Sequence, residues 1–166
     1  FASHDAYAVS DATLARLRRV ADELDARVVI EEPPLQRLNS LGLLRPGFTA
    51  VGNVSEADAA LISDTGVCVV ACVQSDLRLG GRRTPLALLD ARNVTVGLGT
   101  GDPASVGALD LLAESRAAAL GGLTAAQALR AATLGGASAV GLGAETGSLE
   151  PGKSADLVCF DLNRLS

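Results

Sequence analysis

The chain has 166 residues, of which 48% are hydrophobic and only 2% aromatic, and its formal net charge is −5. This length suits a single domain, and the acidic balance, without a basic patch, argues against nucleic acid as a partner. No apolar run is long enough to span a bilayer and no signal peptide opens the sequence, so we expect a cytoplasmic protein without a membrane partner.

Short apolar runs alternate with helical patterns through most of the chain. Ser10 is placed to cap a helix over residues 11–25, and the apolar run 27–30 follows it. Ser55 is placed to cap a helix that stops at Gly66. Further strands are expected over 48–51, 67–73 and 93–99, and further helices over 35–44, 84–92 and 105–120, followed by two Ala-rich helices within 123–142, the first capped by Thr124.

Nearly continuous apolar strands that alternate with helices predict a parallel sheet covered on both faces. Such units fit either half of an eight-stranded barrel or a small doubly-wound domain. The tail differs, because a Pro151-Gly152 turn precedes the extended pattern DLVCFDL. We therefore expect the tail to form a strand of a separate sheet.

The three cysteines are predicted to be buried, reduced thiols. Cys68, Cys72 and Cys159 lie in apolar runs, and the single histidine of the chain cannot complete a zinc site with them. Free cysteine prefers protein interiors, and reduced thiols fit the cytosol.

A glycine-rich turn ends the strand expected over 93–99 and leads to Asp102. Three interpretations remain open: a turn with Asp102 as a helix cap, a functional carboxylate, or a phosphate-binding loop. The last is the weakest, because Asp102 stands where a G-x-G-x-x-G motif needs its third glycine.

Other polar residues also stand near expected strand ends. Glu31 and Glu32 close a strand at the edge where barrels place functional groups, with a solvated strand end as the alternative. Ser75 follows the third strand, and no G-x-S-x-G motif supports serine hydrolysis. His4 precedes the first helix, as a hydrogen-bonding loop residue, as a ligand, or as an acid/base pair with Asp5, although adjacent side chains in an extended segment point apart.

Several motifs together resemble the amidohydrolase superfamily, in its aminohydrolase and chlorohydrolase-like branch, which includes methylthioadenosine/S-adenosylhomocysteine deaminases. HDAYAVSDATL is similar to a stretch H-A-P-Y-T-x-S of that family, and LNSLGLL to its LDSLGLL. CVQSD and LGTGDPAS follow its C-P-x-S-N and L-G-T-D-G-x-x-S motifs, and the segment from AATLGG to CFDL resembles its closing segment.

The resemblance implies an α/β fold: residues 1–145 as the later half of a (β/α)8 TIM-type barrel, and 146–166 as a strand returning to a small β-sandwich. It also implies a zinc- or iron-dependent hydrolase of carbon–nitrogen bonds, such as a deaminase of heterocyclic amines. In such enzymes the metal lowers the pKa of its bound water. An upstream half of the barrel, or another chain, is the implied partner, and we expect an oligomer.

Most of the implied metal ligands are missing from this sequence. The family's histidine after the sixth strand falls at Gly52 and its eighth-strand aspartate at Gly101, next to Asp102. Its fifth-strand H-x-x-E becomes VVIEEPP, with an apparent deletion of the helix beyond. We therefore expect no metal in this chain and impaired catalysis, with a non-catalytic scaffold or regulatory partner as the alternative.

The resemblance also assigns the candidate site residues. His4 matches a family position that contacts substrate, and Ser105 and Glu114 match motif positions of lesser chemistry, whereas Val73 and Asp76 replace the proline and asparagine of C-P-x-S-N. The expected set is Asp102 as a displaced catalytic carboxylate, with substrate contacts from His4, Glu31, Glu32 and Ser75.

Overall fold

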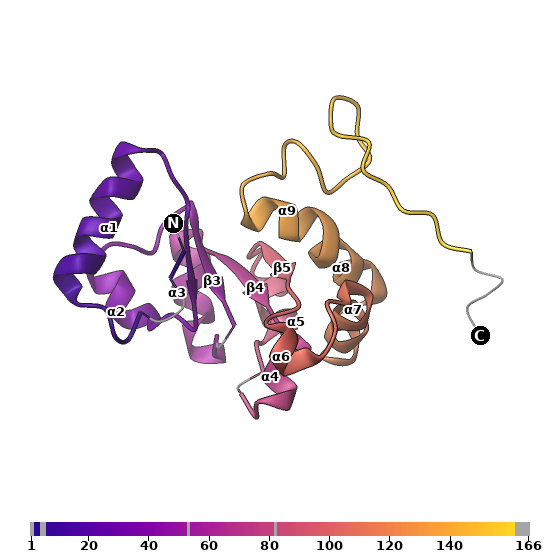
Figure 1. Ribbon diagram of the computed structural model, residues 1–166, viewed down its shortest axis with the longest axis horizontal. Helices are drawn as coiled ribbons and strands as arrows, with labels where there is room; N and C mark the ends of the chain where they lie inside the picture. The colour runs from indigo at the N-terminus through magenta and orange to yellow at the C-terminus, as the bar shows by residue number, and fades with distance from the viewer. Residues whose placement is uncertain (1, 4–5, 53, 82, 162–166) are drawn as a thin grey trace.

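The computed structural model describes residues 2–3, 6–52, 54–81 and 83–161. Its centre is a five-stranded sheet, and helices follow the strands along the chain (Figure 1). The elements are β1 (Ala2–Ser3), α1 (Asp11–Glu23), β2 (Val28–Glu31), α2 (Leu35–Ser40), β3 (Phe48–Val51), η1 (Glu56–Asp58), α3 (Ala59–Thr65), β4 (Cys68–Ala71), α4 (Val73–Arg78), α5 (Leu86–Ala91), β5 (Val96–Leu98), α6 (Pro103–Val106), α7 (Leu111–Leu120), α8 (Ala125–Arg130), the π-helix η2 (Ala131–Gly135) and α9 (Gly136–Ala139).

The sheet is parallel, and its strand order is β1-β2-β3-β4-β5. Each strand pairs with the next along the chain, for example Val28 with Phe48 and Val70 with Gly97. A doubly-wound sheet reverses its order at a switch point, whereas this sequential order is that of a barrel segment. The parallel sheet expected from the sequence is confirmed, and the doubly-wound alternative is wrong.

Several predicted helix ends are confirmed by their capping contacts. The Ser10 side chain accepts a hydrogen bond from the Thr13 backbone N–H at 3.2 Å and begins α1. Gly66 ends α3 with a φ of 68°, a conformation that costs glycine little. Thr124 and Gln127 form a capping box at the start of α8.

Three predicted elements differ in the structure. The strand expected to reach Val73 ends at Ala71, and Val73 begins α4, so apolar character alone did not mark the boundary. The helix expected over 105–120 breaks at Gly107, whose φ is 81°, and Asp110 caps α7 anew. The two helices expected within 123–142 form an unbroken run from α8 through η2 to α9.

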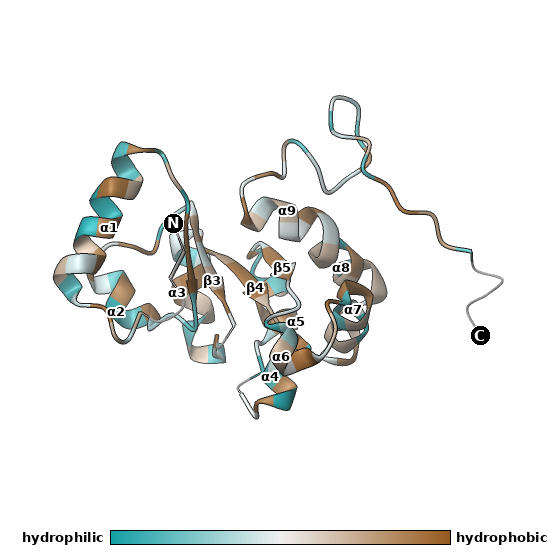
Figure 2. Cartoon of the chain, viewed as in Figure 1, coloured by the Kyte–Doolittle hydropathy of each residue, from teal (hydrophilic) through white to brown (hydrophobic). Residues whose placement is uncertain are grey.

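The tail does not pack as a strand within the described part of the chain. Residues 154–161 are assigned to no helix or strand, and Leu157, Val158 and Phe160 are more than half exposed. Figure 2 shows this apolar stretch extending away from the helices. The β-sandwich strand and the boundary at residue 146 therefore stay predictions.

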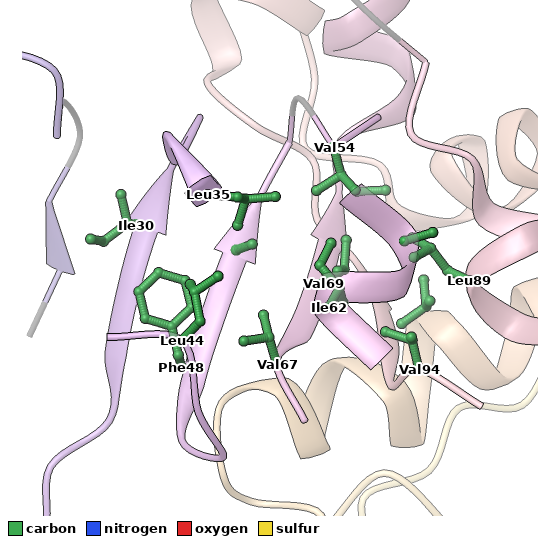
Figure 3. Close-up of a cluster of buried hydrophobic side chains, with 14 of the residues drawn as sticks. Ile30, Leu35, Leu44, Phe48, Val54, Ile62, Val67, Val69, Leu89 and Val94 are labelled. Atoms are coloured by element: carbon green, nitrogen blue, oxygen red, sulfur yellow. The ribbon is translucent and has the colours of Figure 1, made fainter. Parts of the chain in front are cut away.

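The core lies between the sheet and its helices. Phe48 of β3 and Leu44, which precedes that strand, are buried, and so are Ile62 of α3, Leu89 of α5 and Val69 of β4 in the same core cluster (Figure 3). Other large side chains that are fully buried are Leu14, Ile30, Leu38, Val54 and Val67. Among the described residues, no helix is long and apolar enough to cross a membrane.

The cysteines agree with the prediction only in part. All three are free thiols, with Cys72 buried and Cys68 half-buried. Cys159 is exposed, which corrects the expectation of burial, because it lies in an exposed tail segment that forms neither helix nor strand.

Candidate functional site

The carboxyl ends of the parallel strands meet at one edge of the sheet. There Glu31 ends β2, Gly52 follows β3, Cys72 follows β4, and the turn after β5 leads to Asp102. Because parallel α/β folds carry their chemistry at this edge, it is the candidate site.

The sequence-predicted pair Glu31 and Glu32 does lie at this edge. Glu31 is half-buried, whereas Glu32 is exposed and has a φ of 44°. The charge of Glu31 contributes to the raised pKa of Cys72, and the charge of Glu32 to that of Asp76. The structure therefore places the two glutamates at the end of β2 where their charges act on Cys72 and Asp76, which follow β4.

Asp76 of α4 holds the most perturbed carboxyl group of the site. Its Oδ2 is buried and has no hydrogen-bond partner among the described residues, and its Oδ1 lies 3.9 Å from where a Cβ on Gly52 would stand. Burial, reinforced by the charges of Glu114 and Glu32, raises the pKa of Asp76 to about 6. Burial of this carboxyl therefore favours its protonated form.

Glu114 of α7 fixes α4 in place. Its side chain is 0% exposed, and its carboxylate accepts hydrogen bonds from the Gln74 backbone N–H at 3.2 and 3.3 Å and from Gln74 Nε2 at 3.2 Å. Burial raises the pKa of Glu114, while the bonds from Gln74 oppose that shift. The sequence signals for Glu114 were its match to a family motif position and its place four residues before Ala118, on the buried face of α7.

Asp102 acts as a helix cap in the structure. Its exposed side chain accepts a hydrogen bond from the Ala104 backbone N–H at 3.0 Å and begins α6. This contact agrees with the interpretation of the glycine-rich turn in which Asp102 caps a helix. A catalytic role for Asp102 stays a prediction.

Ser75 lies directly against the turn after β5. A Cβ on Gly101, whose φ is 69°, would stand 3.1 Å from the Ser75 Cβ and 3.6 Å from the Cys72 Cβ. Ser75 therefore reaches the candidate site, and its predicted substrate contact stays a prediction. His4, the other predicted contact, lies outside the described residues.

The described residues do not fit a zinc or iron centre. Such a site needs three or four deprotonated ligands. Burial, with the charges of Asp76, Glu114 and Glu31, raises the pKa of the Cys72 thiol to about 11, which disfavours the thiolate. Within the described ranges, no three histidine, cysteine, aspartate or glutamate residues are grouped so as to hold a metal ion.

Comparison with known families explains why this edge resembles an enzyme site. Residues 33–166 match the model of the Amidohydrolase family. The chain belongs to the amidohydrolase family. Members of this family depend on a metal for activity.

The curated relatives of this amidohydrolase carry the names of deaminases. The chain is 40% identical to a 5-methylthioadenosine/S-adenosylhomocysteine deaminase of Teredinibacter turnerae and 34% identical to one of Saccharophagus degradans, over 99% of this chain and 43% of each relative. It thus spans less than half the length of these relatives. The alignment to the first runs over 192 positions against 166 residues, so at least 26 positions of that relative have no counterpart here.

Solved structures support the same assignment. An adenosine deaminase from Xanthomonas campestris with bound zinc is 39% identical and superposes with a TM-score of 0.94 over 99% of this chain and 44% of that one. The atrazine chlorohydrolase TrzN of Arthrobacter aurescens, at 24% identity and a TM-score of 0.85, shows the shared fold over 94% of this chain and 40% of that one. The sheet of this amidohydrolase is therefore part of a TIM-barrel-type fold.

Proposed function

We propose that this chain is part of a deaminase-like amidohydrolase in which metal-dependent hydrolysis of carbon–nitrogen bonds is impaired. The observation that carries the proposal is the pair of glycines, Gly52 and Gly101, at the ends of β3 and β5. The family resemblance places a histidine and an aspartate at these positions.

Neither position is suited to regain a ligand without rearrangement. Both glycines have a positive φ, 66° for Gly52 and 69° for Gly101, which side chains rarely adopt. A Cβ on Gly101 would press on Ser75, and the neighbouring Asp102 is engaged in capping α6. The backbone conformation at both strand ends therefore disfavours any residue other than glycine at these two positions.

The acidic character of this edge suits a heterocyclic amine as its ligand. The carboxyl groups of Glu31, Glu32 and Asp76 offer acceptors for exocyclic N–H groups, and the relatives are named for adenosine derivatives. We propose that His4, Glu31, Glu32 and Ser75 contact such a ligand.

Impaired hydrolysis predicts a negative result in a deaminase assay. The chain, supplied with zinc or ferrous iron and 5′-methylthioadenosine or adenosine, is expected to release no ammonia above the rate without protein. The Teredinibacter turnerae relative serves as the positive control under identical conditions. Metal-dependent ammonia release that Asp102→Asn abolishes would contradict the proposal and make Asp102 the catalytic carboxylate.

A second candidate function is that of a scaffold or regulatory partner that completes a barrel with another chain or with an upstream half. Among the described residues β1 pairs only with β2, so the outer edge of β1 has no strand beside it, whereas η2 and α9 pack against β5. Such an edge favours pairing with another strand.

We expect the 166-residue chain to associate in solution. Sedimentation velocity over a range of concentrations should give a mass above that of the monomer. A monomer with a sharp, cooperative unfolding transition would argue against the scaffold.

A further inference from the structure

Two successive residues of α4 stand beside the two glycines that follow β3 and β5. A Cβ on Gly101 would lie 3.1 Å from the Ser75 Cβ and 3.3 Å from the Ser75 Oγ. For a Cβ on Gly52, the nearest atom among the described residues, chain neighbours apart, would be Asp76 Oδ1 at 3.9 Å. The hydroxyl of Ser75 and the carboxyl of Asp76 therefore lie beside the two positions at which the family resemblance places side chains that this chain lacks.

The first turn of α4 has no cap from its own sequence. Cys72 stands at the N-cap position, and its side chain makes no capping hydrogen bond. The backbone N–H groups of a first helical turn have no partner within the helix and need one from elsewhere. A thiol accepts hydrogen bonds only weakly, unlike the side-chain oxygens that usually cap helices. The start of α4 therefore depends on a contact from another part of the chain.

Glu114 of α7 supplies this contact, although it stands 40 residues after Gln74. Its carboxylate accepts hydrogen bonds from the Gln74 backbone N–H at 3.2 and 3.3 Å and from Gln74 Nε2 at 3.2 Å. The Glu114 side chain is 0% exposed, so water does not compete for these bonds. α4 also packs against α6 and α7 (Figure 1). Because Gln74 directly precedes Ser75 and Asp76, Glu114 fixes the turn from which these two side chains extend.

We propose that Glu114 is a positioning residue of the candidate site. It caps α4 from another helix and so holds Ser75 and Asp76 beside the two glycines, where they contact the ligand. This inference rests on the heterocyclic amine ligand of the proposed function and not on catalysis. Glu114 is fully buried and bonded to Gln74, so it acts on the ligand only through α4.

The position of Ser75 can be observed directly by NMR. One Hα proton of Gly101 points in the direction that a Cβ would take, towards the Ser75 Cβ. This proton and the Hβ protons of Ser75 are therefore close enough to give a nuclear Overhauser effect. The effect reports where α4 stands and requires no ligand.

The test compares Glu114→Ala and Glu114→Gln with the control Glu23→Gln, which removes a carboxylate from the exposed surface of α1. At a temperature where every variant is folded, Glu114→Ala is expected to lose the Ser75–Gly101 Overhauser effect, because the first turn of α4 loses its cap. The same change should weaken binding of 5′-methylthioadenosine, measured by calorimetry, by about tenfold, the loss expected when charge-assisted hydrogen bonds are removed. Glu114→Gln keeps an acceptor oxygen and should lie between the parent and Glu114→Ala, and Glu23→Gln should match the parent.

A purely structural role for Glu114 would lower only the melting temperature. A parent-like Overhauser effect or a parent-like affinity in folded Glu114→Ala would therefore overturn the inference, and the same readings of Glu114→Gln decide the matter should Glu114→Ala not fold. If the parent binds no 5′-methylthioadenosine, the ligand class of the proposed function fails. The Overhauser effect then still decides on Glu114, because its retention overturns the positioning role and its loss supports it.

Discussion

Gly135→Ala is expected to lower the free energy of unfolding by about 3 kcal/mol or to prevent folding, because it forces a helix away from the sheet. A Cβ on Gly135, the last residue of η2, would stand 2.0 Å from the Val96 carbonyl oxygen of β5. The neighbouring contact is also close, since a Cβ on Gly97 would lie 3.0 Å from the Gly136 Cα. The helical run therefore rests on the backbone of β5, where neither partner can yield.

Gly136→Ala provides a matched control in the next residue of the same helix. A Cβ on Gly136 meets its nearest neighbour, the Ala131 carbonyl oxygen, at 3.6 Å, which is ordinary contact. This substitution should stabilise the chain by about 0.5–1 kcal/mol, the advantage of alanine over glycine in a helix. Urea unfolding followed by circular dichroism measures both, and equal stabilities of the two variants would refute the proposed close packing.

Asp76→Asn is expected to stabilise the chain at pH 8 by about 1–2 kcal/mol, after allowance for the partial solvent exposure of the group. The pKa of Asp76 rises from 3.8 to about 6 on folding, because the folded chain buries the carboxyl near Glu114 and Glu32. Its protonated form is therefore favoured in the folded state. Its contribution to stability is fully present below pH 3.8 and is lost as the pH rises towards 6.

An amide keeps the shape of the side chain and cannot ionise, so the Asp76→Asn variant should lose less stability between about pH 4 and 6 than the parent does. The pH dependence that remains should come largely from Glu114, whose pKa is raised as well. Asp64→Asn, on the exposed surface of α3, should leave the profile within about 0.5 kcal/mol of the parent. Parallel profiles for the parent and Asp76→Asn would contradict a buried Asp76 carboxyl.

The sequence was sufficient to predict the order of β2 to β5 and of most helices between them, because their boundaries carry local signals, but it did not predict β1 or α4. Ser10 and Thr124 mark helix starts through their capping contacts, and Gly66 marks a helix end through its left-handed conformation. The strand over Phe48–Val51 was predicted with the bounds that the structure has, because Arg45 and Gly47 precede it and Gly52 follows it.

Long-range packing decided the features that the sequence did not predict. The start of α4 at Val73 depends on Glu114. This residue stands 40 positions after Gln74 in the sequence, and its carboxylate accepts a hydrogen bond from the Gln74 backbone N–H. The burial of Asp76 and Glu114 likewise arises only when α4 and α7 meet at the strand ends. No local pattern reports such a meeting, so these two carboxyl groups were not among the residues expected to form the site.

The strand ends of this amidohydrolase are expected to form no metal centre of their own. The most direct test is the metal content of the 166-residue chain, purified without chelators and measured by plasma emission spectrometry together with any chain that co-purifies. Substoichiometric zinc and iron, and no heat on titration with zinc, are the predicted results. About one tightly bound zinc or iron per chain would contradict this expectation, because such a site needs ligands beyond those that the described residues bring together.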